Sequence, residues 1–404
     1  MTRVVITGLG ITAPNGVGVE EYWAALLAGR SGLRTITRFD AGAYPVRVAG
    51  EVPDFVAEDR IPSRLTVQTD RWTHLGLGAA ELALADAKAD PATFPEYEIA
   101  VVTASSSGGT EFGQVEIEKL WSKGPRAVGA YQSIAWFYAA TTGQISIRHG
   151  MRGPCGVISA EQAGGLDSLG HARRLLRGEV RLVVSGGTDA SLCPYGLVAQ
   201  MSTGLLSHGT DPATAYLPFD TRAAGYVPGE GGAMLIAEAL NRAEERNAPH
   251  VYGEIAGYAA TFDPPPGSGR PAGLRRAITN ALRDAGLGPG DIDVVFADAA
   301  GVPDLDRAEA ADLEAVFGPR GVPVTVPKTL TGRLYAGGAA LDVATALLAL
   351  RDGLIPPTAG VTSPAFPGSL DLVGGEAREA PLRTALILAR GYGGFNAALV
   401  VRAL

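Results

Sequence analysis

The chain has 404 residues, enough for two domains or for one large duplicated domain. Hydrophobic residues make up 46% of it and charged residues only 19%, so we expect a sizeable core and a surface partly covered by a partner subunit. The 34 basic residues are outnumbered by 42 acidic residues. The net charge of -8 argues against binding to nucleic acid or to an anionic membrane surface.

Cysteine content and hydropathy exclude further classes of protein. Cys155 and Cys193 are too few for a disulfide framework, and neither has a second Cys or a His at metal-ligand spacing. The first residues lead directly into a β-branched run and lack the apolar region of a secretory signal. No apolar stretch reaches the ~18 residues that a membrane-spanning helix needs. We therefore expect a cytoplasmic protein without a metal site and without membrane contact.

Short β-branched runs alternate with amphipathic stretches in the first part of the chain, which is typical of α/β layers. The predicted strands are 4–8, 99–103, 156–159, 182–185 and 233–236. The predicted helices are 19–28, 72–87, 110–121, 166–177 and 239–246. The polar, Gly-rich stretch 207–232 is too long for an ordinary connection, so we predict an active-site or interface loop there.

The same alternation restarts after the Pro-rich segment 262–267, which is predicted to be a loop. The later predicted helices are 274–284, 307–317 and 337–351, and the later predicted strands are 293–297, 322–326, 384–389 and 397–402. Two rounds of similar order predict a duplicated α/β fold, although no repeat is visible residue by residue. We place the two halves at 1–250 and 251–404.

Residues 155–165 are the most informative segment for chemistry, because a predicted strand turns sharply into a helix there. A side chain at such a turn lies at the positive end of the helix dipole, where a thiolate or an oxyanion is stabilised. The position carries Gln162, whose amide donates hydrogen bonds but cannot form an acyl-enzyme. Taken alone, the segment is more typical of an ordinary helix N-terminus.

Four further segments are informative: the opening strand 4–10, the central loop segments 218–220 and 229–232, and the glycine loop 391–396. In this order they resemble motifs of the β-ketoacyl synthases of the thiolase superfamily, and the resemblance covers essentially the whole chain. The resemblance implies a thiolase-like fold with a duplicated five-layer αβαβα architecture. It also implies a catalytic Cys in an Ala-Cys-x-x-Gly turn, one His at a strand end and a second His shortly after a Lys.

The chain departs from the family at all three catalytic positions. Gln162 stands at the Cys position, Asp298 at the first His position and Arg333 at the second. Ala300 and Val302 replace the two threonines that would hold a phosphopantetheine arm. Lys328 is retained, and a buried structural ion pair explains its presence as well as chemistry does. We therefore expect a degenerate site with no nucleophile of its own.

These departures make the sequence similar to chain length factors, the β subunits of type II aromatic polyketide ketosynthases. The similarity is carried by segments 135–139, 142–154 and 160–167. It implies a heterodimer with a catalytic ketosynthase α subunit, which extends a poly-β-keto chain on an acyl carrier protein with malonyl units. It also implies that the phosphopantetheine arm acts at that partner subunit and that this chain has no cofactor of its own. Shaping a cavity needs no nucleophile, because it works by steric limits and by shielding ketones from water.

Control of chain length is expected on the helix that begins near Thr110. Thr110, Gly113 and Ile117 recur at i, i+3 and i+7 and therefore share one helical face. The resemblance places that face at the floor of the polyketide cavity, with Ile134 as a further wall. Small side chains there predict a long product. For Gly113, close packing against a neighbouring helix is the alternative explanation.

A second hypothesis makes the chain a malonyl-carrier-protein decarboxylase that supplies primer units. In this hypothesis the Gln162 amide donates a hydrogen bond to a developing enolate oxygen. The chemistry should still require paired histidine donors, and a carboxylate at Asp298 would repel an enolate. Incubation of the chain alone with malonyl-loaded carrier protein distinguishes the two hypotheses, and whether the chain is itself an enzyme stays open.

Overall fold

The computed structural model describes residues 2–265 and 267–404. The main strands of the first half are β1 (Val4–Ala13), β5 (Ile99–Ala104), β6 (Cys155–Ile158), β7 (Leu182–Asp189) and β8 (Gly231–Ala239). Those of the second half are β9 (Gly253–Phe262), β10 (Val294–Phe296), β11 (Pro323–Thr325), β15 (Thr384–Gly391) and β16 (Phe395–Arg402). Shorter strands are β2 (Gly16–Val17), β3 (Leu33–Thr35), β4 (Val48–Gly50), β12 (Leu354–Ile355), β13 (Asp371–Leu372) and β14 (Arg378–Glu379).

The two halves repeat one strand topology. The sheet order is β6-β5-β7-β8-β1 in the first half and β11-β10-β15-β16-β9 in the second, so corresponding strands occupy corresponding places. In each half the first three strands of this order are parallel, and the fourth pairs antiparallel with both the third and the fifth. A short antiparallel contact between β1 and β9 joins the halves. The structure thus confirms the predicted duplicated α/β fold.

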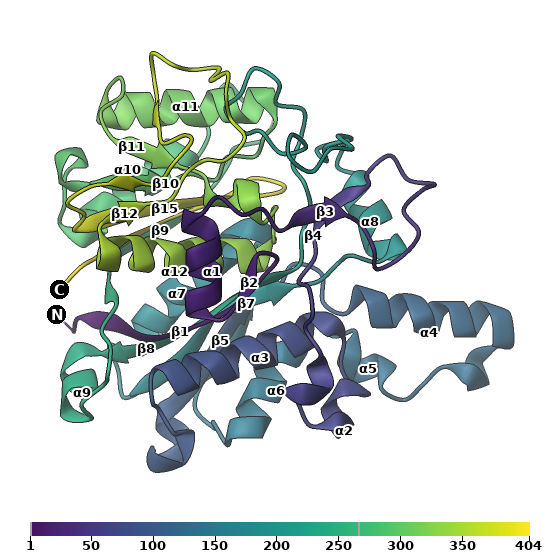
Figure 1. Cartoon of the computed structure of the whole chain (residues 1–404). Coiled ribbons are helices and arrows are strands. Elements are labelled where there is room, and N and C mark those ends of the chain that lie inside the picture. The colour runs from purple at the N-terminus through teal and green to yellow at the C-terminus, as the bar shows by residue number, and fades with distance from the viewer. Residues whose placement is uncertain (1, 266) are drawn as a thin grey trace.

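Helices cover both outer faces of the sheet and fill the space between the two halves (Figure 1). Helices α3 (Arg71–Asp86) and α6 (Ala140–His149) pack on the outer face of the first half, and α10 (Leu274–Ala285) and α11 (Pro303–Phe317) on that of the second. Helices α7 (Gly164–Leu175) and α12 (Ala336–Asp352) form the middle layer. The remaining helices are α1 (Val19–Leu27), α2 (Ser63–Thr66), α4 (Thr110–Lys123), α5 (Gln132–Ala135), α8 (Pro194–Met201) and α9 (Leu240–Glu245).

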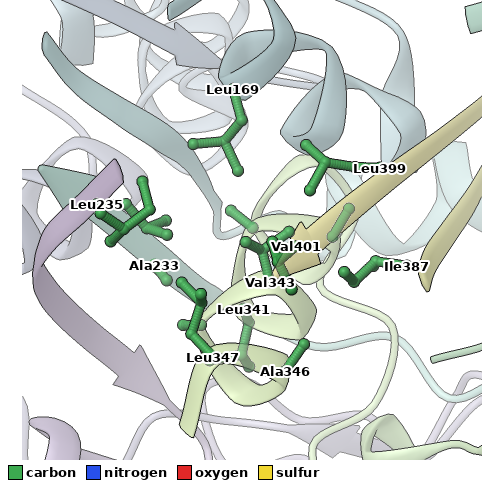
Figure 2. Packing of buried hydrophobic residues seen from close by; sticks show 14 of the residues in the cluster. Leu169, Ala233, Leu235, Leu341, Val343, Ala346, Leu347, Ile387, Leu399 and Val401 are labelled. Carbon is green, nitrogen blue, oxygen red and sulfur yellow. The ribbon is translucent and has the colours of Figure 1, made fainter. Parts of the chain in front are cut away.

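Helix α12 lies in the centre of the molecule and is buried on every side from its start to Leu350. Figure 2 shows Leu341 and Leu347 of α12 among side chains from both halves of the sheet, such as Leu235 and Leu399. A helix between two sheets has no solvent face, which explains its run of Ala, Leu and Val. Gly337 lets the helix approach β8, since a Cβ there would lie 2.1 Å from a backbone oxygen of Gly231.

The predicted elements of both rounds are present, with shifted ends. Strand β1 runs on to Ala13, and strand β9 and helices α6 and α8 were not predicted. In the segment predicted as a loop, Phe262 ends β9 and Pro266 lies outside the described residues. The division between residues 250 and 251 falls in the connection from α9 to β9 and stays a prediction.

Within 2–265 and 267–404, no helix has both the length and the apolar character that crossing a membrane requires. The same residues contain no group of three or more His, Cys, Asp or Glu side chains placed to hold a metal ion.

Candidate functional site

Gln162 lies in a short 3-10 turn (Glu161–Ala163) between β6 and α7. The preceding residue, Glu161, has a φ of +48°, so the backbone makes the sharp turn that the sequence predicts. The Gln162 side chain is fully buried and its amide makes no hydrogen bond to the described residues. The Gln162 side chain lies against Gly338 of α12. A Cβ added to Gly338 would lie 2.9 Å from Gln162 Nε2.

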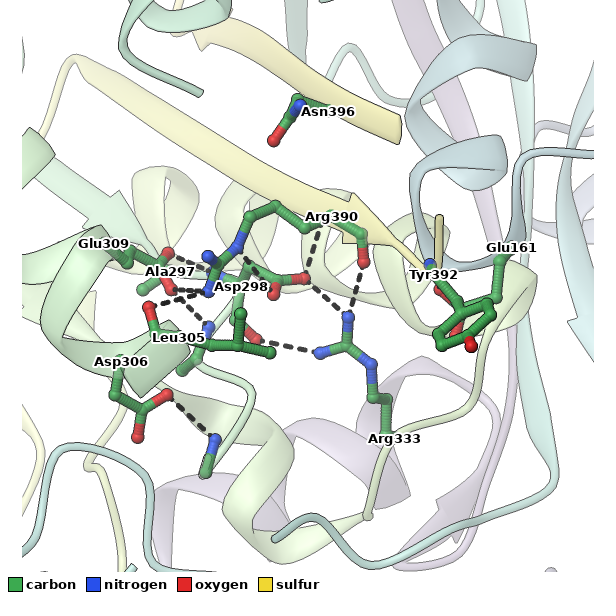
Figure 3. A network of polar contacts seen from close by, with 12 residues as sticks. Glu161, Ala297, Asp298, Leu305, Asp306, Glu309, Arg333, Arg390, Tyr392 and Asn396 are labelled. Carbon is green, nitrogen blue, oxygen red and sulfur yellow. Dashed lines mark hydrogen bonds and ion pairs between the residues drawn. The ribbon is translucent and has the colours of Figure 1, made fainter. Parts of the chain in front are cut away.

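Asp298 and Arg333 form a buried ion pair. Asp298 follows β10, and Arg333 follows a 3-10 turn (Pro327–Leu330) that leads to α12. Arg333 Nη2 donates to Asp298 Oδ1 at 2.9 Å, and both side chains are almost completely buried. Arg390, in β15, donates to the same carboxylate through its backbone N–H at 2.8 Å and its Nε at 3.3 Å. Figure 3 shows Asp298 between the two guanidinium groups.

A second carboxylate completes this cluster. Glu309 of α11 accepts hydrogen bonds from the backbone N–H groups of Asp298 and Ala299, at 2.8 and 2.9 Å, and pairs with Arg390 at 3.1 Å. Two carboxylates thus face two guanidinium groups, and the cluster is electrically balanced (Figure 3). Charges so deeply buried need this degree of pairing.

The cluster is unsuited to proton transfer. Burial by itself raises the pKa of Asp298, but Arg333 and Arg390 outweigh burial and hold that pKa below its ordinary value. Burial by itself lowers the pKa of Arg333, but Asp298, Glu161 and nearby tyrosines together outweigh burial and hold that pKa well above its ordinary value. A carboxylate that stays ionised and a guanidinium that stays protonated do not exchange protons near neutral pH. The pair cannot do the work of two histidines.

Lys328 forms a buried ion pair, which is the structural explanation that the sequence allows for this residue. Its Nζ lies 2.8 Å from Asp342 Oδ2 and donates to the carbonyl oxygen of Ala297 at 2.5 Å. Asp342 is the one acidic residue in the buried part of α12. The pair therefore ties the loop after β11 to the central helix.

Two adjacent cavities, called the outer and the inner cavity below, share part of their lining. The outer cavity, about 410 Å³, is lined by Asp298, Ala300, Val302, Arg333 and Arg390 among others. No hydroxyl is present at Ala300 or Val302, the two positions where the family pattern has threonine. The inner cavity, about 220 Å³, is lined by Thr110, Ser106, Ser107, Ser191 and Tyr335 among others.

The four residues expected to control chain length have different surroundings. Thr110 is buried and lines the inner cavity. Gly113 packs against Trp136, whose Cδ1 would lie 2.8 Å from an added Cβ, so close packing explains this glycine. Ile117 and Ile134 are 42% and 37% exposed in the single chain, and a partner would have to cover them. Their role in a cavity stays a prediction.

Four residues of this region were not selected from the sequence. Arg390 and Glu309 hold Asp298, while Tyr226 and Tyr392 line both cavities. Glu309 ends the segment Asp306-Arg307-Ala308-Glu309, which resembles an Asp-Arg-x-Glu motif of the family and from which Asp298 is located by counting back. Tyr392 lies in the glycine loop, so both residues had a signal in the sequence. Arg390 had none, because 92 positions separate it from Asp298.

Comparisons with known proteins agree with this geometry. The family model for the β-ketoacyl synthase N-terminal domain matches residues 1–243, and the model for the C-terminal domain matches residues 252–362. The chain therefore belongs to the β-ketoacyl synthase family. Identities of 63% and 61% over 99% of the chain, to relatives from two polyketide synthases, place it among the ketosynthase β subunits, or chain length factors.

Its relatives illustrate that branch. The tetracenomycin polyketide synthase ketoacyl synthase β subunit of Streptomyces glaucescens is 63% identical over 99% of this chain and 98% of its own length. The ishigamide ketosynthase/chain length factor is 29% identical, with a TM-score of 0.90 over 100% of this chain and 99% of the other. Another similar structure is a type II polyketide synthase acyl-carrier protein in complex with its ketosynthase bound to the hexaketide. It is 27% identical, with a TM-score of 0.88 over 100% of this chain and 99% of the other.

Proposed function

We propose that this chain is the non-condensing β subunit of a type II polyketide ketosynthase. It pairs with a catalytic α subunit and shapes the cavity that limits the growing poly-β-ketone. The observation that carries this proposal is the buried Asp298–Arg333 ion pair, which occupies the two positions where a condensing enzyme needs histidines. With Gln162 at the nucleophile position, the chain lacks both the acyl acceptor and its acid–base partners.

An exposed apolar surface supports pairing with the α subunit. Helices α4 and α5 project from the first half of the molecule, on the side away from both chain ends (Figure 1). Large hydrophobic side chains are exposed on these helices and on the segments next to α5: Val115, Ile117, Leu120, Trp121, Tyr131, Ile134, Trp136, Phe137 and Tyr138. So many exposed apolar side chains within residues 115–138 favour a protein interface. Because Thr110 begins α4, the same contact brings the inner cavity close to the partner.

Similar proteins support the proposed partners, a ketosynthase and an acyl carrier protein, and a polyketide as the product. One neighbour is a carrier protein in complex with its ketosynthase bound to a hexaketide, and another is a ketosynthase/chain length factor. For this chain, we infer that the phosphopantetheine arm of the carrier protein acts at the α subunit, since Ala300 and Val302 offer it no hydroxyl here. A cytoplasmic location remains part of the proposal.

A reconstitution tests the proposal. The chain alone, the α subunit alone and the two together are incubated with malonyl-loaded carrier protein, and products are identified by mass spectrometry. We expect polyketide only from the complex and no acetyl-carrier protein from the chain alone. Acetyl-carrier protein from the chain alone that is lost in Gln162→Ala would support the decarboxylase hypothesis instead. Condensation by the chain alone would overturn both.

A further inference from the structure

The inner and outer cavities share three lining residues, Glu161, Tyr226 and Tyr392. The inner cavity contains Thr110, and the outer cavity contains the Asp298–Arg333 pair. The two spaces are thus neighbours that share part of their walls. Whatever fixes these side chains decides how far a molecule can extend from Thr110.

Tyr226 is buried and held on two sides. The Arg333 guanidinium lies over its ring, 5.5 Å from the ring centroid, and Tyr335 packs edge-on with its centroid at 6.3 Å. Arg333 is itself fixed by Asp298. Tyr335 is fixed by donating from its hydroxyl to Gln200 Oε1 at 2.7 Å. A cation over an aromatic face is attracted to it, most strongly away from water. The ion pair at the former catalytic positions therefore positions Tyr226.

Tyr392 approaches the same boundary from the glycine loop. Its backbone N–H donates to Glu161 Oε2 at 2.8 Å, which ties the loop to the turn that carries Gln162. The residues that follow, Gly393 and Gly394, have φ values of +89° and +113°, a backbone that other residues rarely adopt. The Tyr392 ring is 63% exposed, so its truncation removes little core packing.

We propose that Tyr226 and Tyr392 form the end wall of the chain-length cavity, and that Arg333 is the positioning residue for Tyr226. This inference rests on the proposed function, because a chain-length limit exists only in a complex that makes polyketide. Removal of either ring joins the inner cavity to the outer one. The growing chain then has additional space beyond Thr110, and the product becomes longer.

Truncation of the rings in the reconstituted complex tests the wall. With Tyr226→Ala or Tyr392→Ala, the product distribution is expected to move by at least one malonyl unit toward longer chains. Tyr97→Ala is the matched control, because Tyr97 is exposed and lies in neither cavity. Unchanged or shorter products from both variants, in complexes that still condense, would overturn the proposal. If Tyr226→Ala fails to fold, the product length made with Tyr392→Ala still tests the proposal, because Tyr392 is exposed.

Two further variants separate the possible failures. Thr110→Phe is measured in parallel: if it shortens the product while both alanine variants leave length unchanged, the wall is wrong and the proposed function stands. If none of the three changes the length, the proposed function has failed as well. Arg333→Lys keeps a positive charge near Asp298 but loses the planar group over Tyr226. A positioning role predicts longer products from it, whereas unchanged products with lower thermal stability would assign Arg333 a structural role only.

Discussion

Arg333 and Asp298 lie 2.9 Å apart, at the two positions where the sequence motifs predict the histidines of the family's condensing enzymes. Asp298 without Arg333, or Arg333 without Asp298, would leave a poorly compensated charge in the interior. Together the carboxylate and the guanidinium group compensate each other. The pair is therefore a structural contact rather than a pair of acid–base groups. That contact holds the loop after β10 against the loop that begins α12.

The first prediction concerns this pair. Asp298→Ala leaves Arg333 buried with only part of its compensation, and breaking a buried pair from one side costs about 3–5 kcal/mol. We expect a clear fall in the thermal unfolding midpoint of the purified complex. Asp304→Ala is the control, because Asp304 pairs with Arg307 on the exposed surface, where such pairs contribute about 0–1 kcal/mol. Equal midpoints for the two variants would contradict the assignment.

The second prediction concerns the Lys328–Asp342 pair. Lys328→Met leaves the Asp342 carboxylate without its cation in the centre of the molecule, so the complex should lose stability strongly. Adding Asp342→Leu removes the stranded charge and should recover much of the loss, since an apolar pair can replace a buried ion pair. Denaturation of the two variants side by side checks this. A double variant less stable than the single one would show that the pair is needed for another reason.

The third prediction concerns pH. Asp189 is fully buried and accepts hydrogen bonds from the backbone N–H groups of Ser106 and Ala336; burial raises its pKa to about 7. The folded state therefore holds this proton at pH values where the unfolded chain has released it. This stabilisation is complete below the unfolded pKa, near 4, and is lost as pH rises through about 7.

Asp189→Asn, which cannot titrate, tests that linkage. Because the pKa of Asp189 is about 7, the informative range lies between about pH 5 and that value. As pH rises through this range, the free energy of unfolding of the wild type should fall more steeply than that of the variant. The difference in slope should approach one proton, about 1.4 kcal/mol per pH unit. Parallel curves for the two proteins would show that Asp189 does not titrate in this range.

The fourth prediction concerns the lost nucleophile. Gln162→Cys restores a thiol at the turn, but Asp298 and Arg333 cannot supply the acid–base steps, and such residues act as a unit. We expect no condensation by this variant when the α subunit is absent, even at high enzyme concentration. Substantial condensation by the single variant would mean that the site still supports the chemistry.

Much of the fold was readable from the sequence because buried strands and amphipathic helices alternate in it. Strand β9 was missed because Gly and Ala fill it where a strand signal needs β-branched residues. Helix α6 was missed because its Thr, Ser and Gly residues are weak helix formers, and packing against α3 and β5 stabilises it.

The site was predictable only in part. A motif in the sequence identifies Gln162, Asp298 and Arg333, because each lies in a segment with a recognisable pattern. The contacts of these residues depend on the fold, which brings Arg390 from β15 and Glu309 from α11 to one carboxylate and its loop. The surroundings of Gly113 likewise depend on Trp136, which the helical spacing could not place.

The length of the product made with Thr110→Phe is the most direct test of the central claim. Thr110 is buried at the start of α4 and lines the inner cavity, so a phenyl ring there should fill part of that space. Thr279→Phe, on the exposed face of α10, is the control. In complexes with the α subunit, we predict shorter polyketides from Thr110→Phe and wild-type lengths from the control. Wild-type lengths from an active Thr110→Phe complex would contradict the claim that this chain sets the limit at its inner cavity.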